Sequence, residues 1–186
     1  SDHAKKIINE LKFKLTNCQK KAIEEINQDL RNENRMFRII QGDVGSGKTI
    51  VALITAFNVI NSDFQCAFMA PTEILAKQHY ELAKKIFDNK KVKVSYITGK
   101  TEPKARKEIL KNLANGKINL IIGTHALFQK KVIFKKLGLI VVDEQHKFGV
   151  RQRMNLAKKG GNNCDVLLMS ATPIPRTMML TIQSHI

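Results

Sequence analysis

The stretch MFRIIQGDVGSGKTIVALITAFNVI, residues 36–60, decides the fold. It opens with an apolar run at 36–40 and continues through a loop that contains three glycines. From Ile50 to Ile60 the apolar residues then recur with the spacing of a helix. Its loop, GDVGSGKT (42–49), matches the pattern G-x-x-x-x-G-K-[ST] between a strand and a helix. The stretch therefore predicts a strand, a phosphate-binding loop and a helix in direct succession.

Short apolar runs like the one at 36–40 recur along the chain. They lie at 64–70, 94–97, 119–123, 137–142 and 165–169. Continuous apolar runs, without alternating polar residues, are typical of parallel strands buried on both faces. Helical patterns at 73–87 and 102–114 separate several of them, and Pro103 suits the first turn of the second helix. We predict a doubly wound α/β domain with a mostly parallel sheet and helices on both faces.

The N-terminal part of the sequence has two helical patterns within residues 3–32. Each places four apolar residues on one face: Ala4, Ile7, Ile8 and Leu11, then Ala22, Ile23, Ile26 and Leu30. No repeat or low-complexity linker interrupts the sequence, so we expect a single domain over 1–186. It contains neither an apolar run long enough to span a membrane nor a signal-peptide core. Because it begins without Met, we expect a fragment of a longer protein.

The charge balance indicates the class of partner, and the cysteine spacing indicates the redox compartment. Lysine and arginine number 32 against 16 acidic residues, a net charge of +16. Such an excess favours a polyanion such as nucleic acid, although a lysine-rich solvated surface gives the same count. The three cysteines, Cys18, Cys66 and Cys164, are far apart. Their spacing predicts small buried side chains in a reducing compartment and no disulfide or zinc framework.

The glycine loop predicts a bound nucleoside triphosphate. Gly45 and Gly47 let backbone amides turn toward phosphate oxygens, and the following helix adds the positive end of its dipole. Lys48 would reach the β- and γ-phosphates, while Thr49 would ligate Mg²⁺. The predicted nucleotide-binding residues of the loop are Gly42, Asp43, Val44, Gly45, Ser46, Gly47, Lys48 and Thr49.

Two adjacent acids, Asp143 and Glu144, follow the apolar run at 137–142. Two acids can simply end a strand, but a phosphate loop requires a second acidic site on a neighbouring strand. Asp143 would hold Mg²⁺ through its water shell, and Glu144 would take the proton from the attacking water. A transition-metal site at His146 lacks a partner at metal-ligand spacing.

The motifs together resemble those of superfamily 2 helicases, whose motor domains have a RecA-like fold. DEQH (143–146) resembles their acidic box, APTEILAKQH (70–79) their motif Ia and MSATPIPRT (169–177) their motif III. The longer forms DEQHKFGVRQR and SATPIPRT resemble the RecG family of bacterial branched-DNA helicases over nearly all of the chain. Transcription-repair coupling factors are also similar, but there we expect DEEH and a different residue at Ser46.

The resemblance implies roles for further residues. FKLTNCQ (13–19) resembles an adenine-reading motif with Gln19 as reader and Phe13 stacking nearby, although Thr16 and Gln19 also form a helix capping box. The implied DNA-contacting residues are Pro71, Thr72, Gln78, Thr98, Gly99, Thr124 and His125. The residues implied to couple nucleotide to DNA are Gln145, His146, Ser170 and Thr172.

Each of these roles has a structural alternative. Thr72 suits the start of a helix, and Ser170 and Thr172 suit the end of a strand. Tyr80 and Phe87 recur at helical spacing and are predicted core residues, not stacking platforms for bases. Arg151 and Arg153 contact DNA or a second motor domain, or else lie in a solvated loop.

As the first motor domain of such a helicase, the chain is expected to use ATP and Mg²⁺ and to act on branched or forked DNA. A second motor domain of the same full-length protein would supply the arginine that stabilises the γ-phosphate. The resemblance implies a monomer in the bacterial cytoplasm.

Two other classes of protein also use phosphate loops. A small-molecule kinase needs an acceptor pocket and lid arginines, and a GTPase needs a guanine-reading N-K-x-D, which Asn89-Lys90-Lys91-Val92 does not match.

Overall fold

The computed structural model describes residues 37–41, 46–88, 90–144 and 164–170. Within these ranges the strands are β1 (Phe37–Gln41), β2 (Gln65–Met69), β3 (Val94–Ile97), β4 (Leu120–Gly123), β5 (Leu137–Glu144) and β6 (Asp165–Ser170). The helices are α3 (Ser46–Ile60), α4 (Glu73–Ile86) and α5 (Pro103–Ala114), with a short 3₁₀ turn, η1 (His125–Phe128), after β4.

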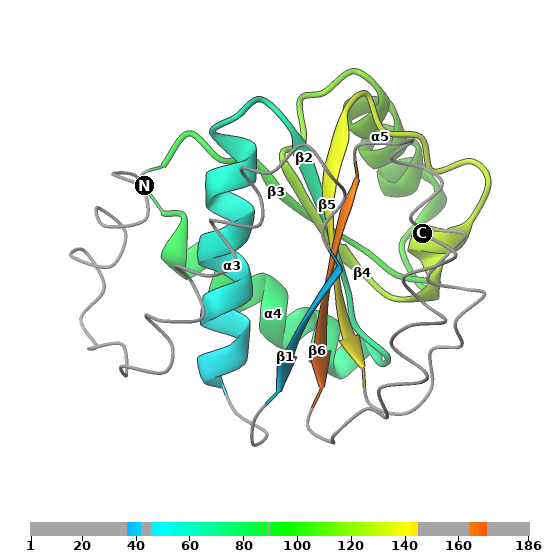
Figure 1. Ribbon diagram of the computed structural model, residues 1–186. Coiled ribbons are helices and arrows are strands. Elements are labelled where there is room, and N and C mark those ends of the chain that lie inside the picture. Colours follow the sequence, from blue (N-terminus) through cyan, green and yellow to red (C-terminus); the bar gives the residue numbers. More distant parts are fainter. Residues whose placement is uncertain (1–36, 42–45, 89, 145–163, 171–186) are drawn as a thin grey trace.

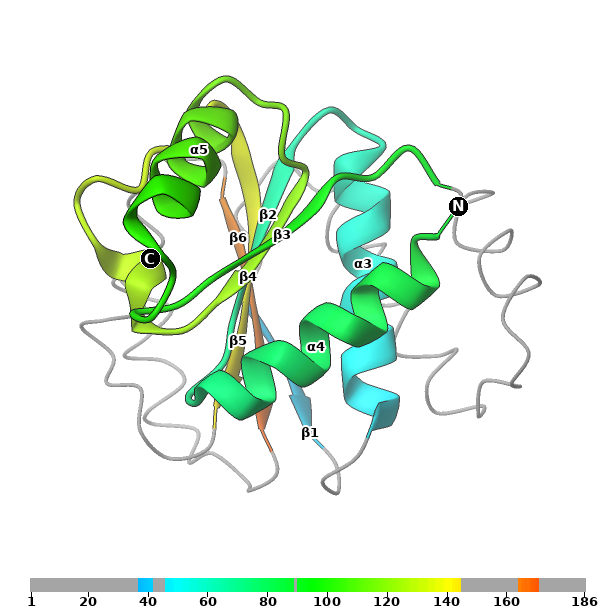
Figure 2. The ribbon, with the colours of Figure 1, turned by 180° about the vertical axis from the view of Figure 1, so that it is seen from behind.

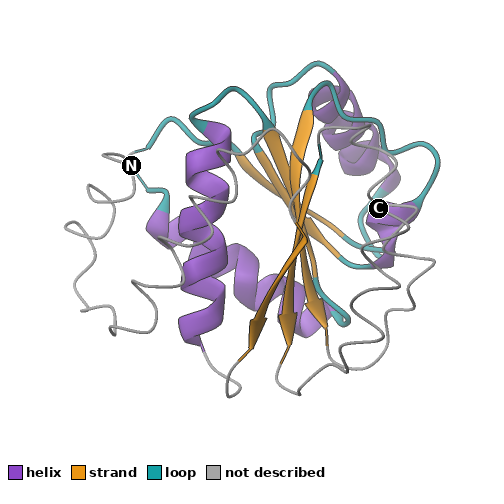
Figure 3. Cartoon of the chain, viewed as in Figure 1, coloured by secondary structure: helices purple, strands orange, loops and turns teal. Residues whose placement is uncertain are grey.

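The strands form one sheet in the order β1-β6-β5-β2-β4-β3, and every described pair of neighbours is parallel. Figures 1 and 2 show α3 and α4 on one side of this sheet and α5 on the other. Figure 3 shows the same layers by secondary structure, with helices flanking the strands. The predicted parallel α/β architecture is confirmed.

Two apolar clusters, one on each face, account for the continuous apolar runs. Along β2, Cys66 and Phe68 belong to the cluster under α3 and α4, while Ala67 and Met69 belong to the cluster on the α5 side. Successive residues of a strand point to opposite faces. A strand covered on both sides must therefore be apolar at every position.

Helix α3 begins earlier and β5 ends later than predicted. The apolar periodicity starts at Ile50, but α3 begins at Ser46, because the polar end of the glycine loop already has helical backbone. Strand β5 was predicted to end at Val142, yet its ladder continues through Asp143 and Glu144 to Met169 and Ser170 of β6. Main-chain pairing does not require apolar side chains, so the acids lie within the strand.

Several side chains predicted to be buried are in the core. Phe87 is buried and stacks on Phe57 with ring centroids 5.7 Å apart. Tyr80 packs against the α3/α4 cluster and lies 5.4 Å from the ring of Tyr96.

The two cysteines in the described part of the chain, Cys66 and Cys164, are both buried thiols. Burial, with a smaller contribution from Cys164, raises the pKa of the Cys66 thiol well above its ordinary value. Cys18 and the predicted helices within 3–32 lie outside the described residues. None of the described helices is long and apolar enough to cross a membrane.

Candidate functional site

The carboxyl ends of the parallel strands share one edge of the sheet, and α3 begins there (Figure 1). Ligands of open parallel α/β sheets bind at this edge. Since α3 begins at Ser46, the amides of its first turn have no partner within the helix, and its dipole is positive there. Lys48 and Thr49 lie in this first turn, so the structure places the end of the predicted phosphate loop where an anion is stabilised.

Three strand ends lie in register beside this helix terminus. Gln41 of β1 pairs with Ser170 of β6, and Ser170 pairs with Glu144 of β5. Ser170, a predicted coupling residue, therefore lies between the strand that leads into the phosphate loop and the strand that carries the acid pair. The backbone brings together three motifs that are far apart in sequence.

A hydrogen-bonded chain of side chains links α3 to β5 through α4. Nε2 of His79 lies 2.8 Å from Oδ2 of Asp143, and Nδ1 of His79 lies 3.5 Å from Oγ1 of Thr49. All three residues are buried, with exposed fractions of 4% for Thr49, 7% for His79 and 8% for Asp143. The imidazole packs against Phe68, with ring centroids 4.7 Å apart. The two predicted metal-directed residues are therefore held to one common partner.

The oxygens at this edge suit Mg²⁺. A hydroxyl and a carboxylate are the hard ligands that Mg²⁺ prefers, and the ion usually takes one or two protein oxygens together with phosphate oxygens and water. Among the described residues no group of three or more His, Cys, Asp and Glu could hold a metal unaided. Such a group is not needed where a nucleotide supplies ligands, so Thr49 and Asp143 fit this ion.

His79 is a site residue that the sequence reading missed. It shares a buried face of α4 with Ala76, Ala83 and Ile86. The signal was present, because a histidine on an otherwise apolar helix face needs a buried polar partner. The partner, Asp143, lies 64 residues away along the chain, so only the fold could identify it.

The start of α4 has the local structure that its sequence predicts. Thr72 is the N-cap, and its side chain accepts a hydrogen bond from the amide of Leu75 at 3.2 Å. The amide of Ala70 donates to the carbonyl of Gly123 at 2.9 Å, which ties the ends of β2 and β4 together. Thr72 and Gln78 are exposed, so both side chains can reach a ligand outside the domain.

The loop after β3 is tied to the turn after β4 by Arg106 of α5. Its guanidinium donates to the backbone carbonyl of Thr98 and, at 3.0 Å, to Oε1 of Gln129. Thr98 is buried and its hydroxyl accepts from the amide of Lys100 at 3.2 Å, whereas Gly99 is exposed. Thr124 is buried and His125 exposed. Nothing in the lysine-rich sequence of α5 distinguished Arg106 beforehand.

Several predicted site residues lie outside the described residues: Phe13, Gln19, Gly42, Asp43, Val44, Gly45, Gln145, His146 and Thr172. Arg151 and Arg153 also lie outside them. Their roles stay predictions.

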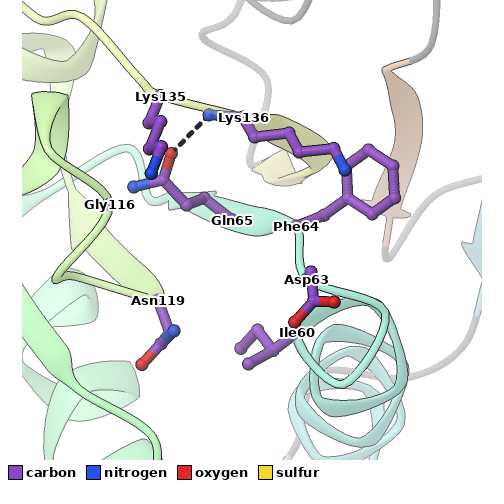
Figure 4. A pocket seen from close by; sticks show the side chains of 8 residues that line it. All are labelled: Ile60, Asp63, Phe64, Gln65, Gly116, Asn119, Lys135 and Lys136. Carbon is purple, nitrogen blue, oxygen red and sulfur yellow. Dashed lines mark hydrogen bonds between the residues drawn. The ribbon is translucent and has the colours of Figure 1, made fainter.

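A pocket of about 320 Å³ lies at the opposite, amino-terminal edge of the sheet (Figure 4). Gln65, Asn119 and Lys136, each next to the start of a strand, are among its lining residues. The ammonium of Lys136 lies 4.3 Å from the centroid of the Phe64 ring. Because ligands of parallel sheets bind at the carboxyl edge, this pocket is not the nucleotide site.

Comparison with known proteins identifies the family. A family model described as DEAD/DEAH box helicase matches residues 16–180. The ATP-dependent DNA helicase RecG of Aquifex aeolicus is 50% identical over 179 residues, which is 96% of this chain. RecG of Thermotoga maritima is also 50% identical, over 177 residues and 95% of this chain. The chain spans 23% of the length of each of these two relatives.

Solved structures agree with the fold. A structure of RecG bound to a three-way DNA junction matches 98% of this chain and 24% of that chain, with a TM-score of 0.83 at 45% identity. The helicase Mss116p, bound to single-stranded RNA and AMP-PNP, matches 100% of this chain and 41% of that chain, with a TM-score of 0.77 at 25% identity. These findings confirm the predicted RecA-like fold and the predicted similarity to RecG. The family model covers most of the sequence, and the chain therefore belongs to the DEAD/DEAH box helicase family.

Proposed function

We propose that the chain is the first motor domain of an ATP-dependent DNA helicase of the RecG type, which couples ATP hydrolysis to the remodelling of branched DNA. One observation supports this most directly. The first turn of α3 and the end of β5 are joined through His79, with 2.8 Å between His79 Nε2 and Asp143 Oδ2. A nucleotide-driven motor needs a phosphate-binding helix terminus close to an acidic strand end. The relatives at 50% identity are DNA helicases of this name.

The proposed chemistry uses residues at the carboxyl edge. Lys48 and the amides at the start of α3 bind the phosphates, and Thr49 and Asp143 hold Mg²⁺, which neutralises charge on the phosphate oxygens. Glu144, the last residue of β5, takes a proton from the attacking water. Gln19 and Phe13 contact the adenine.

DNA is the proposed second partner. Pro71 and Thr72 precede the first turn of α4, where a phosphate is stabilised by free amides and the helix dipole. Gln78, Gly99 and His125 are exposed in segments that leave the same sheet edge. Contacts from these residues to the DNA backbone would change when Gln145, His146, Ser170 and Thr172 respond to the nucleotide.

The second motor domain, the oligomeric state and the cellular compartment are proposed from the same relatives. A second motor domain in the full-length protein supplies an arginine to the γ-phosphate across the cleft between the domains. The protein acts as a monomer in the bacterial cytoplasm, where its DNA substrate lies.

Substitution of Glu144 by Gln in the full-length protein tests the proposal. General-base catalysis contributes about 10²–10⁴-fold, so we expect DNA-stimulated ATP hydrolysis to fall by at least about 100-fold. ATP binding, measured by equilibrium titration, should persist because the phosphate loop is intact.

Glu102→Gln is the matched control. Glu102 precedes α5, is exposed and makes no side-chain cap to that helix, so the rate should not change. If Glu144→Gln hydrolyses ATP as fast as the parent, Glu144 is not the base.

A further inference from the structure

We propose that His79 is a positioning residue of the nucleotide site, which fixes Thr49 and Asp143 in the orientation that binds the metal of a metal–nucleotide complex. This inference rests on the proposed function, because it assigns a third residue to the same site. His79 touches neither nucleotide nor metal in this scheme. It acts through two hydrogen bonds, one to each of the proposed ligand side chains, Thr49 and Asp143.

For a neutral imidazole, the protons of the three side chains allow one consistent arrangement. A neutral imidazole donates from one nitrogen and accepts at the other. A carboxylate only accepts, so Nε2 donates to Oδ2 of Asp143, and Nδ1 accepts from the hydroxyl of Thr49. The alternative tautomer would place an acceptor nitrogen against a carboxylate at 2.8 Å, which is repulsive.

This arrangement leaves the metal-directed lone pairs available. When the Thr49 hydroxyl donates its hydrogen to His79, both lone pairs of Oγ1 can face a cation. Asp143 uses one oxygen for His79 and keeps its other oxygen for a metal-bound water. Mg²⁺ demands near-ideal octahedral geometry, so the orientation of its few protein ligands matters more than for a larger ion.

The surroundings of His79 hold the ring in place. It is 7% exposed, packs against Phe68 at 4.7 Å and shares its helix face with Ala76 and Ala83. Ala76 and Ala83 are small and the Phe68 ring is flat, so the orientation of the imidazole is set by its two polar contacts. Outer partners of this kind usually change metal affinity or activity by about 10–100-fold when they are removed.

Three substitutions of His79 in the full-length protein separate the contacts. His79→Phe keeps a flat ring against Phe68 but removes both hydrogen bonds. His79→Gln places an amide near the Nε2 position and can still donate to Asp143. His79→Asn places an amide oxygen near the Nδ1 position and can still accept from Thr49.

The readout is metal binding, not turnover. Mn²⁺ replaces Mg²⁺, and its affinity for the ADP-loaded protein is measured from the loss of the free-ion electron paramagnetic resonance signal. ADP affinity is measured separately in EDTA, and the melting temperature without ligand reports on the fold. Ile86→Val is the control, because Ile86 lies on the same buried face of α4 two turns further along.

We expect His79→Phe to weaken Mn²⁺ binding by about tenfold or more, with the ADP affinity in EDTA within about twofold of the parent. His79→Gln or His79→Asn should recover part of the loss, and the better of the two identifies the more important contact. Ile86→Val should lower the melting temperature and leave Mn²⁺ affinity unchanged.

Two results would overturn the inference while leaving the proposed function intact. One is parental Mn²⁺ affinity in His79→Phe. The other is a loss of metal-free ADP binding as large as the loss of Mn²⁺ binding, which would make the role of His79 purely structural. If the parent protein itself bound no ADP, the proposed function would fall together with the inference.

Discussion

Gln65 joins three segments at the amino-terminal edge of the sheet. Its Nε2 donates to the carbonyls of Leu113 and Ile118, both at 2.9 Å. Its Oε1 accepts from the amide of Lys136 at 2.8 Å, the bond drawn as a dashed line in Figure 4. The residue is 4% exposed. One buried amide thus satisfies backbone groups that precede β4 and β5. The carbonyl of Leu113 also accepts from the amide of Gly116, but an apolar side chain at position 65 would remove the side-chain partner of the Ile118 carbonyl and of the Lys136 amide.

We expect Gln65→Leu to lower the free energy of unfolding by roughly 3 kcal/mol, since each buried group left unsatisfied costs about 1–3 kcal/mol. Urea titration followed by circular dichroism measures the change. The same substitution at Gln78, which is exposed on α4, should change stability by less than about 0.5 kcal/mol. Equal effects at the two positions would show that the hydrogen bonds of Gln65 contribute little.

At the scale of elements, the close contact between the ends of β3 and β4 is possible because position 123 is a glycine. A Cβ atom at Gly123 would lie 2.5 Å from the carbonyl oxygen of Ile97 and 3.1 Å from Cγ of Leu127. Real Cβ atoms do not come this close to backbone. The close approach sets where β4 ends and where η1 begins, and both segments lead into the carboxyl edge.

Gly123→Ala should destabilise the domain by roughly 1–3 kcal/mol, the usual cost of overpacking, because the strand end or η1 must shift. Thermal unfolding measures it. Gly99→Ala is the matched control, because a Cβ there meets nothing within 4 Å. A stable Gly123→Ala protein would mean that the two strand ends separate easily.

The sequence predicted the strands and helices well where one physical cause, such as burial, determines the residue pattern. Burial of both sheet faces makes a central strand a continuous apolar run, so the fully buried strand β4 was predicted, at 119–123, to within one residue of its observed bounds. The start of α3 was missed by four residues, because Ser46–Thr49 carries no apolar periodicity. Asp143 and Glu144 were predicted as site residues for two reasons. They directly follow an apolar run, and the chain also contains a phosphate loop, which requires acidic residues on a neighbouring strand.

What could not be predicted depends on contacts between distant segments. His79 and Asp143 meet only because α4, which packs on β3 and β4, brings His79 to the end of β5. Arg106 meets Gln129 only because the fold brings α5 to the end of η1. Strand order is of the same kind. The apolar run of β6 does not reveal that it lies between β1 and β5.

At the scale of the whole molecule, the proposed motor needs a second motor domain to complete the nucleotide site at the carboxyl edge of the sheet. In the proposed mechanism, residues at the carboxyl edge supply phosphate binding, metal ligands and a base, and the arginine comes from a second motor domain. Such an arginine contributes about 10³–10⁵-fold to kcat. If the proposal holds, the domain alone binds a nucleotide more readily than it hydrolyses it.

The 186-residue chain alone should hydrolyse ATP at least about 1,000-fold more slowly than the full-length protein with forked DNA, because the arginine is worth that much. Steady-state phosphate release measures both rates. Adding DNA to the chain alone should have little effect. Turnover by the chain at the full-length rate would mean that its own residues complete the site.

The position of β1 in the sheet has a consequence for synthesis on the ribosome. Among the described strands β1 lies at one edge of the sheet, and it pairs there with β6, Phe37 facing Val166, 129 residues later in the chain. At 5–20 residues per second the ribosome takes on the order of ten seconds to make that interval. β2, β3, β4 and β5 can already pair while β1 waits. β1, which leads into the proposed phosphate loop, can therefore join the sheet only after β6 emerges, so the proposed nucleotide site is completed late in synthesis.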